Sequence, residues 1–412
     1  MKGAFLLFLL YCPQLIFSQQ ALPLSAELLI KRNEDPAILN DEKLLANSLF
    51  KRGYHTWSKD SIINIMLPEV WKERDSIARI YSNRKKHIQY YYANKISAFS
   101  NGIKSRFMRG ETWKVLADSA LKTIPMPETT LLSYSQSANQ FLENYIVNEL
   151  MEIFLQAREH GEYIIGEKFG LSIDTLKKKA EKHGELFLNI LYAKAVLPGK
   201  LYERYLANQT LNRAGDLDLM TAKTIFSQLK KVFPESRFRD VCKKEITLLE
   251  ANITRSSGNK NIIFIKNPDS IRFLDSLIAP YKGNVVYLDI WGTWCGPCIT
   301  EISQHTKPLK AYFKDVTQLV FLYLAMERPQ DAEKWREFIL LHNVTGAHIY
   351  KNDKEIEPFW VDLLNTKDVP RSYPTYAIFD RNGKLVTAQA YRPSNGEALY
   401  KQLEEVLAKK EN

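Results

Sequence analysis

The chain has 412 residues, with 57 lysines and arginines against 47 aspartates and glutamates, which gives a formal net charge of +10. Hydrophobic residues make up 45% and charged residues 25% of it, a balance that excludes a disordered or collagen-like chain and indicates globular domains. Four cysteines are too few for the disulfide framework of a small secreted protein. A chain of this length has room for two or more domains of ordinary size.

The first residues have the features of a secretory signal peptide. Lys2 is followed by an apolar run from Ala4 to Tyr11 and by a polar exit at Ser18. The run is too short to span a bilayer. We therefore expect residues 1–18 to be removed and the mature protein to lie in the periplasm, without a stable membrane span, either free or associated with the membrane. Lipidation of Cys12 is the alternative, but a lipobox requires a small residue where Tyr11 stands.

Residues 19–255 are predicted to form an all-helical domain, because apolar residues recur at helical spacing with few internal glycine or proline breaks. Stretches such as Tyr134–Glu159 and Ser236–Ala251 carry this pattern. Without Lys2 the mature chain has 56 basic and 47 acidic residues, a balance of +9, and residues 260–412 contain 20 and 19 of them. The helical domain therefore carries +8 of the charge.

Two features of this domain have both a functional and a structural interpretation. Tyr90, Tyr91 and Tyr92 follow the basic residues 84–86, a combination also found in nucleic-acid binding. An exported protein rarely meets nucleic acid, so we expect core tyrosines beside a solvated basic face, and no nucleic-acid partner. Cys242 shares a helical face with Phe238 and Ile246, which predicts a small buried hydrophobe. A third redox-active thiol exchanging with Cys298 is the alternative.

Ser256–Lys260 has the composition of a linker, and beyond it short apolar runs alternate with helices. Residues 256–412 are therefore predicted to form a second domain, with a central mixed β-sheet flanked by helices. The expected strands are Ile262–Ile265, a central buried strand that starts at Val285, Leu319–Ala325, Thr375–Phe379 and Leu385–Ala390, the last two forming a hairpin. The expected helices are Ser270–Ala279, one that begins near Cys295, Gln330–His342 and Glu397–Lys409.

The chemistry is expected at Cys295 and Cys298, which are separated by Gly296 and Pro297 and directly follow the central strand. Proline suits the first turn of a helix, where its missing N–H costs nothing. Free amide groups and the helix dipole at that end favour a thiolate, so we expect a lowered pKa for Cys295 and a buried resolving role for Cys298. A zinc half-site is the alternative, but the sequence has no second Cys-x-x-Cys or Cys/His pair, so no metal is predicted.

The sequence WCGPC after a buried strand resembles the active site of thioredoxins. The run W-G-T-W-C together with Glu301 resembles the TlpA/ResA-like extracytoplasmic branch, with a helical extension of the kind seen in Bacteroidota. The resemblance is strong over 260–412 and loose over the helical domain. It implies a thioredoxin fold, with Tyr350–Leu364 as the insertion of this branch. It also implies no cofactor beyond a redox-active disulfide, Cys295–Cys298.

The resemblance also implies further site residues. Asp289 and Glu301 match the acidic residues that accept the proton of the resolving thiol; the alternatives are a satisfied strand-end group for Asp289 and a solvated carboxylate for Glu301. Pro374 matches the cis-proline that faces the cysteines in this fold. Ser303 replaces a proline that usually kinks the active-site helix, so a straighter helix is expected. The predicted substrate-binding residues are Trp294, Gly296, Pro297, Tyr373 and Pro374.

These features predict a thiol–disulfide oxidoreductase that reduces disulfides of protein substrates. The Cys295 thiolate attacks the substrate disulfide, and Cys298 then resolves the mixed disulfide. A reductase in an oxidising compartment has to be recharged, which implies a membrane electron donor of the CcdA/DsbD type. Two alternatives stay open: a disulfide oxidase or isomerase, and a partner-binding protein whose thioredoxin fold is accessory.

Overall fold

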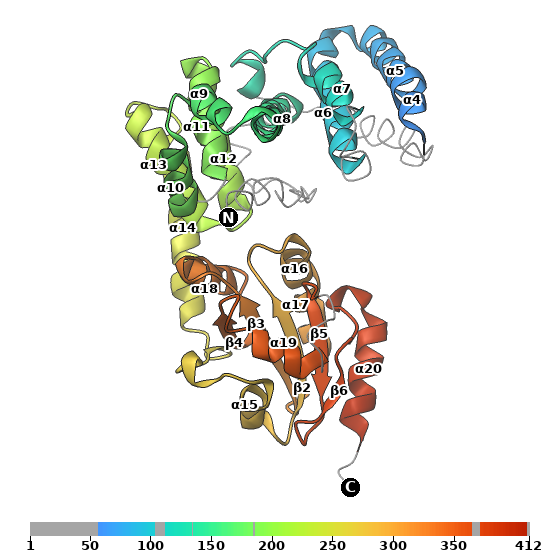
Figure 1. Cartoon of the computed structure of the whole chain (residues 1–412), viewed down its shortest axis with the longest axis vertical. Helices are drawn as coiled ribbons and strands as arrows, with labels where there is room; N and C mark the ends of the chain where they lie inside the picture. Colours follow the sequence, from blue (N-terminus) through green and yellow to red (C-terminus); the bar gives the residue numbers. More distant parts are fainter. Residues whose placement is uncertain (1–56, 104–111, 134, 184–185, 365–370, 410–412) are drawn as a thin grey trace. The chain divides into compact units, whose positions relative to one another are not determined.

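The computed structural model describes residues 57–412, except 104–111, 134, 184–185, 365–370 and 410–412. The predicted signal peptide, with Cys12, lies outside the described residues. Across the described ranges, no helix is long and apolar enough to cross a membrane. The chain divides into two compact units: apart from the short segment Leu217–Leu219, the first extends to Ile246 and the second begins at Thr247 (Figure 1).

In its described part, the first unit is built of helices. Its α-helices are α4 (Lys59–Ser61), α5 (Leu67–Ile80), α6 (Lys85–Ile103), α7 (Thr112–Leu121), α8 (Gln136–His160), α9 (Tyr163–Phe169), α10 (Ile173–His183), α11 (Leu186–Val196), α12 (Gly199–Gly215), α13 (Leu219–Val232) and the first part of α14 (Arg239–Ser257). Its shorter helical turns are η3 (Ile62–Met66), η4 (Ser82–Arg84) and η5 (Leu131–Ser133).

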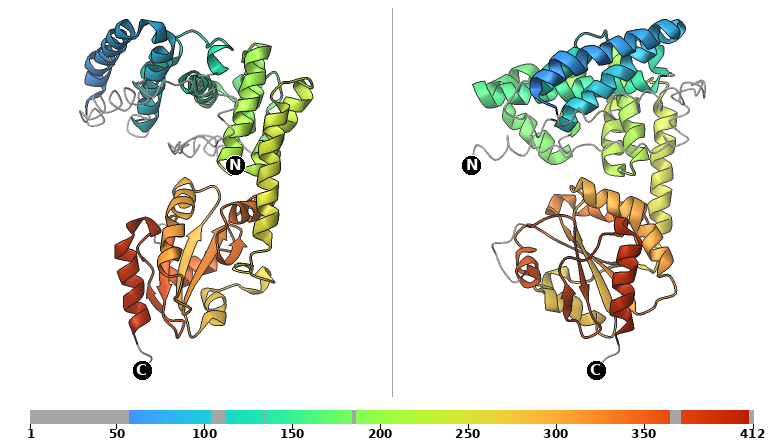
Figure 2. Two further views of the ribbon diagram at one scale, coloured as in Figure 1. Left: turned by 180° about the vertical axis from the view of Figure 1, so that it is seen from behind. Right: turned by 90° about the vertical axis from the view of Figure 1, so that its right-hand side faces the viewer.

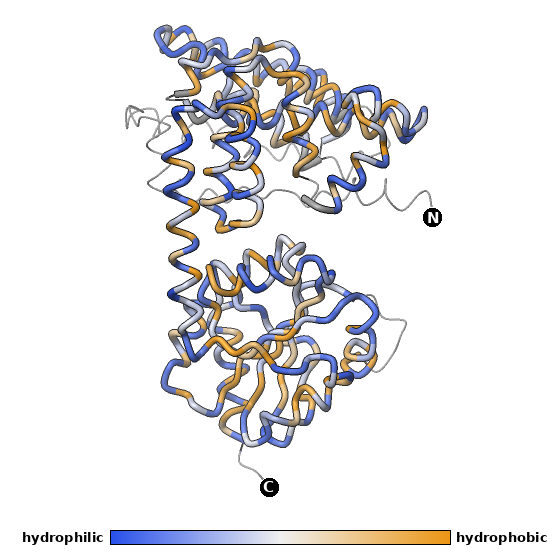
Figure 3. The backbone as a smooth tube through the Cα atoms, turned by 90° about the vertical axis from the view of Figure 1, so that its left-hand side faces the viewer, coloured by the Kyte–Doolittle hydropathy of each residue, from blue (hydrophilic) through white to orange (hydrophobic). Residues whose placement is uncertain are grey.

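Local sequence explains where the longest of these helices begins and ends. The Ser135 hydroxyl accepts a hydrogen bond from the amide of Ala138 at 3.1 Å and so caps the first turn of α8. Gly161 ends the helix with φ at 121°, a backbone conformation that favours glycine. Apolar and polar residues alternate along such helices, as the hydropathy colouring shows (Figure 3).

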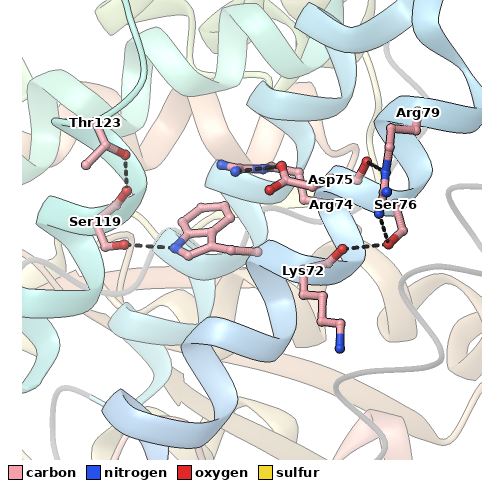
Figure 4. A network of polar contacts seen from close by, with 8 residues as sticks. Lys72, Arg74, Asp75, Ser76, Arg79, Ser119 and Thr123 are labelled. Carbon is pink, nitrogen blue, oxygen red and sulfur yellow. Dashed lines mark hydrogen bonds and ion pairs between the residues drawn. The ribbon is translucent and has the colours of Figure 1, made fainter.

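The aromatic and polar contacts of the first unit are structural. Tyr90, Tyr91 and Tyr92 on α6 are all buried, which confirms the prediction of core tyrosines. Between α5 and α7, the indole N–H of Trp71 donates to the Ser119 hydroxyl at 3.0 Å, beside a chain of hydrogen bonds along α5 (Figure 4). These contacts join neighbouring helices, so we interpret these aromatic residues as structural.

Cys242 lies on α14 with no exposed surface, and burial raises the pKa of its thiol to about 12. A thiol with so high a pKa is almost wholly protonated at neutral pH and is a poor nucleophile. Phe238, Ile246 and Leu249 on the same helix face are buried with it. The structure thus supports the small buried hydrophobe over the redox-active thiol.

The second unit is built around a six-stranded sheet with the strand order β1-β4-β3-β2-β5-β6. The first four strands in this order are parallel, and β5 and β6 run antiparallel to their neighbours. The strands are β1 (Ile262–Phe264), β2 (Val285–Trp291), β3 (Leu319–Met326), β4 (Gly346–Lys351), β5 (Thr375–Phe379) and β6 (Leu385–Thr387). A mixed sheet of this order, with a helix directly after its central strand, is the thioredoxin fold.

Helices cover both faces of this sheet (Figure 2). On one face, α15 (Leu274–Ile278) and α19 (Glu357–Leu364) pack on alternate residues of β2 such as Leu288. The other face carries α16 (Gly296–Thr300), α17 (Thr306–Tyr312), α18 (Ala332–Leu341) and α20 (Glu397–Ala408). The short turns are η6 (Pro268–Ser270), η7 (Ala279–Tyr281), η8 (Glu301–His305), η9 (Pro329–Asp331) and η10 (Pro393–Asn395). Every residue of β2 is buried, as expected of a strand covered on both faces.

The structure differs from the sequence expectations at β4. β4 was not predicted, because Gly346, His348 and Lys351 interrupt its apolar pattern; His348 is nevertheless fully buried. The active-site helix is not a continuous α-helix, since the π-helical segment η8, which contains Ser303, separates α16 from α17. Such π-bulges occur often at functional sites.

The division between the units falls inside α14, which runs to Ser257 without a break. The predicted linker Ser256–Lys260 therefore begins in the last turn of a helix. The units divide before the predicted linker because Ile253 on α14 packs against the apolar cluster that contains Cys295 and Cys298. The second half of α14 is thus part of the sheet-containing unit.

Candidate functional site

Cys295 and Cys298 form a disulfide, with their Cα atoms 5.2 Å apart. Cys295 is the N-cap of α16, and its sulfur accepts a hydrogen bond from the amide of Cys298 at 3.2 Å. Pro297 occupies the first turn, where the helix needs no N–H from it. Cys298 is fully buried and Cys295 is 5% exposed, so a reagent reaches Cys295 first.

The turn between β2 and α16 depends on a glycine. The indole N–H of Trp294 folds back to donate to the carbonyl of Met326 at the end of β3, at 2.8 Å. A Cβ on Gly292 would collide with that indole and with the same carbonyl. Glycine at 292 therefore allows Trp294 to lie beside Cys295, where 45% of its surface stays exposed. Gly296, by contrast, borders open space.

Glu327 holds the same turn from the next strand, and the sequence analysis missed it. It follows β3 directly and is fully buried. Its carboxylate accepts hydrogen bonds from the Thr293 amide and from the Thr293 hydroxyl, the latter at 2.9 Å. Burial raises the pKa of Glu327 to about 7, against the lowering effect of both bonds. In sequence, an acid after a strand and before Pro329 is typical of a solvated loop, so no local signal marks its role.

Asp289 lies at the centre of a row of polar residues that crosses four strands. It pairs in register with Tyr323 on β3 and with Tyr376 on β5, and Tyr323 pairs with His348 on β4. Asp289 is 2% exposed, and among the described residues its Oδ1 has no hydrogen-bond partner. Burial and, second, the charge of Glu301 hold the pKa of Asp289 well above its usual value. The interpretation as a satisfied strand-end group is therefore not supported.

Lys310 on α17 is the cation whose charge acts on Asp289. Its ammonium group lies 4.8 Å from the ring centre of Tyr323 and donates to the carbonyl of Thr345. Burial lowers the pKa of Lys310 to about 7, while the charge of Asp289 raises it. In the other direction, Lys310 opposes the rise in the pKa of Asp289. No sequence pattern marks this lysine, because it lies one helix away from the motif.

Glu301 is buried, so the alternative of a solvated carboxylate is wrong. One carboxylate oxygen accepts from the Ser394 amide at 2.9 Å and the other from the Ser394 hydroxyl at 2.6 Å. Glu301 starts η8, whereas Ser394 belongs to η10, which precedes α20. The contact thus ties the active-site helix to the segment before the last helix.

Tyr373 packs near the disulfide and precedes Pro374. The Tyr373–Pro374 peptide bond is cis, as expected from the resemblance. The ring of Tyr373 packs against the apolar cluster that contains Cys295 and Cys298. It also meets the ring of Trp294 edge-on, with the ring centres 4.9 Å apart.

The structure therefore groups the predicted residues around one disulfide. Asp289 lies on the sheet face covered by α16 and α17, and Trp294 and Tyr373 lie beside the cysteines. Glu301 instead accepts hydrogen bonds from Ser394. Across the described part of the chain, no three His, Cys, Asp or Glu side chains form a group that would hold a metal ion. The arrangement provides a disulfide whose first cysteine is slightly exposed and whose second is fully buried, and a buried carboxyl group with one oxygen that has no partner among the described residues.

Part of the chain is similar in sequence to a known oxidoreductase. The chain is 28% identical over 109 residues to thiol-disulfide oxidoreductase ResA of Geobacillus thermodenitrificans, a match that covers 26% of this chain and 55% of that relative. The chain thus spans about half the length of the curated relative that it matches. No family model matches the chain.

Solved structures with similar parts include two thioredoxin-type proteins. One is the thioredoxin domain of a thiol-disulfide oxidoreductase from Bacteroides vulgatus, at 20% identity and a TM-score of 0.25, covering 31% of this chain and 81% of that one. The other is the exposed lipoprotein thioredoxin Etrx1 of Streptococcus pneumoniae, at 23% identity and a TM-score of 0.23, covering 33% and 96%.

Proposed function

We propose that this protein is a thiol–disulfide oxidoreductase that reduces disulfides of protein substrates outside the cytoplasm. The observation that carries the proposal is the Cys295–Cys298 disulfide at the start of α16, in which Cys295 is the less deeply buried of the two cysteines. The similarity to ResA supports the reaction class. The leader-like residues 1–18 support the location.

In the reduced protein, the Cys295 thiolate attacks one sulfur of the substrate disulfide. A mixed disulfide forms, and the other substrate sulfur leaves as a thiolate that takes up a proton. The Cys298 thiol then loses its proton and attacks the Cys295 sulfur, which releases the second substrate thiolate. The substrate gains two electrons and two protons in all, and the protein is left with the Cys295–Cys298 disulfide.

The second step needs a base, because a buried thiolate is unfavourable without one. Asp289 is our candidate, since burial and the charge of Glu301 raise its pKa and its Oδ1 is free of partners within the described chain. Two electrons must then restore the dithiol. We propose a membrane electron donor of the CcdA/DsbD type, because an oxidising compartment offers no soluble reductant of this strength.

The roles of the two cysteines are tested by trapping. Cys298→Ser is expected to accumulate mixed disulfides through Cys295, because the first attack survives and the resolving attack is lost. Cys295→Ser is the matched control and is expected to trap nothing. Non-reducing electrophoresis followed by mass spectrometry measures both. Equal trapping by the two variants would contradict the assignment of nucleophile and resolving thiol.

A further inference from the structure

Trp360 on α19 is fully enclosed, with 1% of its surface exposed, and it belongs to the apolar core on the opposite side of the sheet from α16. A buried indole N–H needs an acceptor. Its acceptor here is the phenolic oxygen of Tyr373, at 3.2 Å. The two rings also meet edge-on, with their centres 5.4 Å apart. Trp360 therefore fixes both the position and the tilt of the Tyr373 ring.

The fixed Tyr373 ring continues to the redox site. Its other ring contact is with Trp294, whose own indole N–H is bound to the carbonyl of Met326. Trp294 directly precedes Cys295 and is nearly half exposed. Two indole hydrogen bonds thus hold a pair of edge-to-face rings beside Cys295, the less deeply buried cysteine. We call Trp294 and Tyr373 the aromatic wall.

We propose that Trp360 is a positioning residue for substrate selection, which holds the aromatic wall in the orientation that receives the polypeptide flanking a substrate disulfide. This inference rests on the function proposed above. The substrate class is an extended protein segment with an apolar side chain next to its cysteine. Ring faces bury such side chains, whereas a small disulfide without flanking residues gains nothing from the wall.

The experiment compares two substrates. Insulin presents a disulfide with flanking polypeptide, and 5,5′-dithiobis(2-nitrobenzoate) presents one without it. The full mature chain is tested on both. In the insulin assay, dithiothreitol reduces the protein again after each turnover. The variants are Trp360→Phe, which keeps a ring but removes the N–H, and Tyr373→Phe, which removes only the acceptor. A hydrogen bond of this kind is worth about 1 kcal/mol, so KM for insulin should rise about fivefold in each variant. In Trp360→Phe, the rate with the small disulfide and the redox potential should stay unchanged.

Trp335→Phe is the matched control. Trp335 is likewise a buried tryptophan of the sheet-containing unit, but its indole nitrogen has no hydrogen-bond partner in the described part of the chain. The same substitution there removes no such bond and should leave the ratio of insulin to small-disulfide reduction as it is. The double variant Trp360→Phe, Tyr373→Phe should be no worse than either single variant, because both remove the same bond.

The outcomes separate this inference from the proposed function. A wild-type ratio in Tyr373→Phe, or an equal fall in Trp335→Phe and Trp360→Phe, would overturn the role of Trp360 while insulin reduction itself stands. If Trp360→Phe fails to fold, Tyr373→Phe decides alone. A wild-type protein that reduces the small disulfide but not insulin would instead remove the proposed function, and this inference with it.

Discussion

Asp289 and Glu301 are both buried carboxylic acids of the redox unit, but they differ in their hydrogen bonds. Both oxygens of Glu301 are engaged by Ser394, whereas Oδ1 of Asp289 has no partner among the described residues. A carboxylate that already accepts two hydrogen bonds gains less from taking up a proton. We infer that Asp289 receives the proton of Cys298 and that Glu301 anchors the segment before α20.

Asp289→Asn should therefore slow the release of substrate from the mixed disulfide by roughly 100-fold at neutral pH, the lower end of the contribution of a general base. The reason is that Cys298 then has no acceptor for its proton. Stopped-flow measurement of thiol release between pH 6 and 9 follows this step, and the difference should shrink towards high pH, where the thiol ionises unaided. Ser394→Ala is the control: it should lower stability and leave this rate almost intact. Slower release in Glu301→Gln, together with unchanged release in Asp289→Asn, would contradict the role of Asp289 as the proton acceptor.

The residues that lie within the motif could be predicted from sequence, and those that act across the fold could not. Cys295, Cys298 and Asp289 have fixed spacings along one strand and one helix. Glu327 and Lys310 reach the site from other elements, and their neighbours in sequence are ordinary loop and helix residues. Strand register brings Glu327 to the turn at Thr293, and the packing of α17 brings Lys310 to the row around Asp289.

At the scale of elements, the ends of β2 and β3 form one unit with the redox turn. Trp294 is bound to the last residue of β3, and Thr293 is bound to Glu327 just beyond it. Burial raises the pKa of Glu327 from 4.5 to about 7. The folded protein therefore binds more protons than the unfolded chain between these two pH values. Stability from this group is present below pH 4.5 and is lost as the pH rises through 7.

Glu327→Gln should remove this pH dependence while keeping the turn, because the glutamine amide can accept from the Thr293 amide and donate to the Thr293 hydroxyl. Relative to the wild type, its free energy of unfolding should rise by up to roughly 3 kcal/mol between pH 4.5 and 7.5. Glu327→Ala should instead lose about 1 to 3 kcal/mol at low pH, since the amide of Thr293 is left unpaired. Urea unfolding across this pH range measures both. A Gln variant that keeps the wild-type slope would show that Glu327 is not the titrating group.

The elements themselves were largely predictable where hydrophobic periodicity is strong. β2, β3 and β5 are apolar runs that the sequence marks clearly, and the β5–β6 hairpin closes through the expected turn at Asp380–Gly383. β4 escapes the pattern because His348 is buried as a neutral ring: burial lowers its pKa to about 3. The ring stacks on Tyr323, with their centres 4.8 Å apart. The Nε2 of His348 is hydrogen-bonded to the carbonyl of Val344 at 2.7 Å, a contact that periodicity cannot show.

At the scale of the whole molecule, α14 belongs to both units. Its first part carries Cys242 in the helical core, and its second part places Ile253 on the cluster around the redox cysteines. The predicted domains 19–255 and 256–412 therefore meet within the last turns of a continuous helix. The helical unit carries an excess of positive charge, and we expect it to favour partners with acidic surfaces.

A chain of residues 247–412 should consequently be more stable than one of residues 260–412, because only the longer chain keeps the contact of Ile253. Burying an isoleucine contributes about 1.5 to 3 kcal/mol when complete, so a difference of about 1 kcal/mol is expected for this partly buried side chain. Thermal and urea unfolding of both chains, with Ile253→Ala in the longer one as control, provide the comparison. Both chains should reduce insulin. Equal stability would mean that the packing of α14 on the redox unit is dispensable.

The most direct test of the central claim is the reduction potential of the Cys295–Cys298 disulfide in the full mature protein. The protein is equilibrated with dithiothreitol buffers of known potential and then alkylated. Mass spectrometry gives the fraction of reduced protein at each potential. A reductase with Gly-Pro between its cysteines should have a value close to that of thioredoxin, about −270 mV. A value near that of a strong oxidant, about −120 mV, would contradict the proposed reduction of protein disulfides and favour a disulfide oxidase.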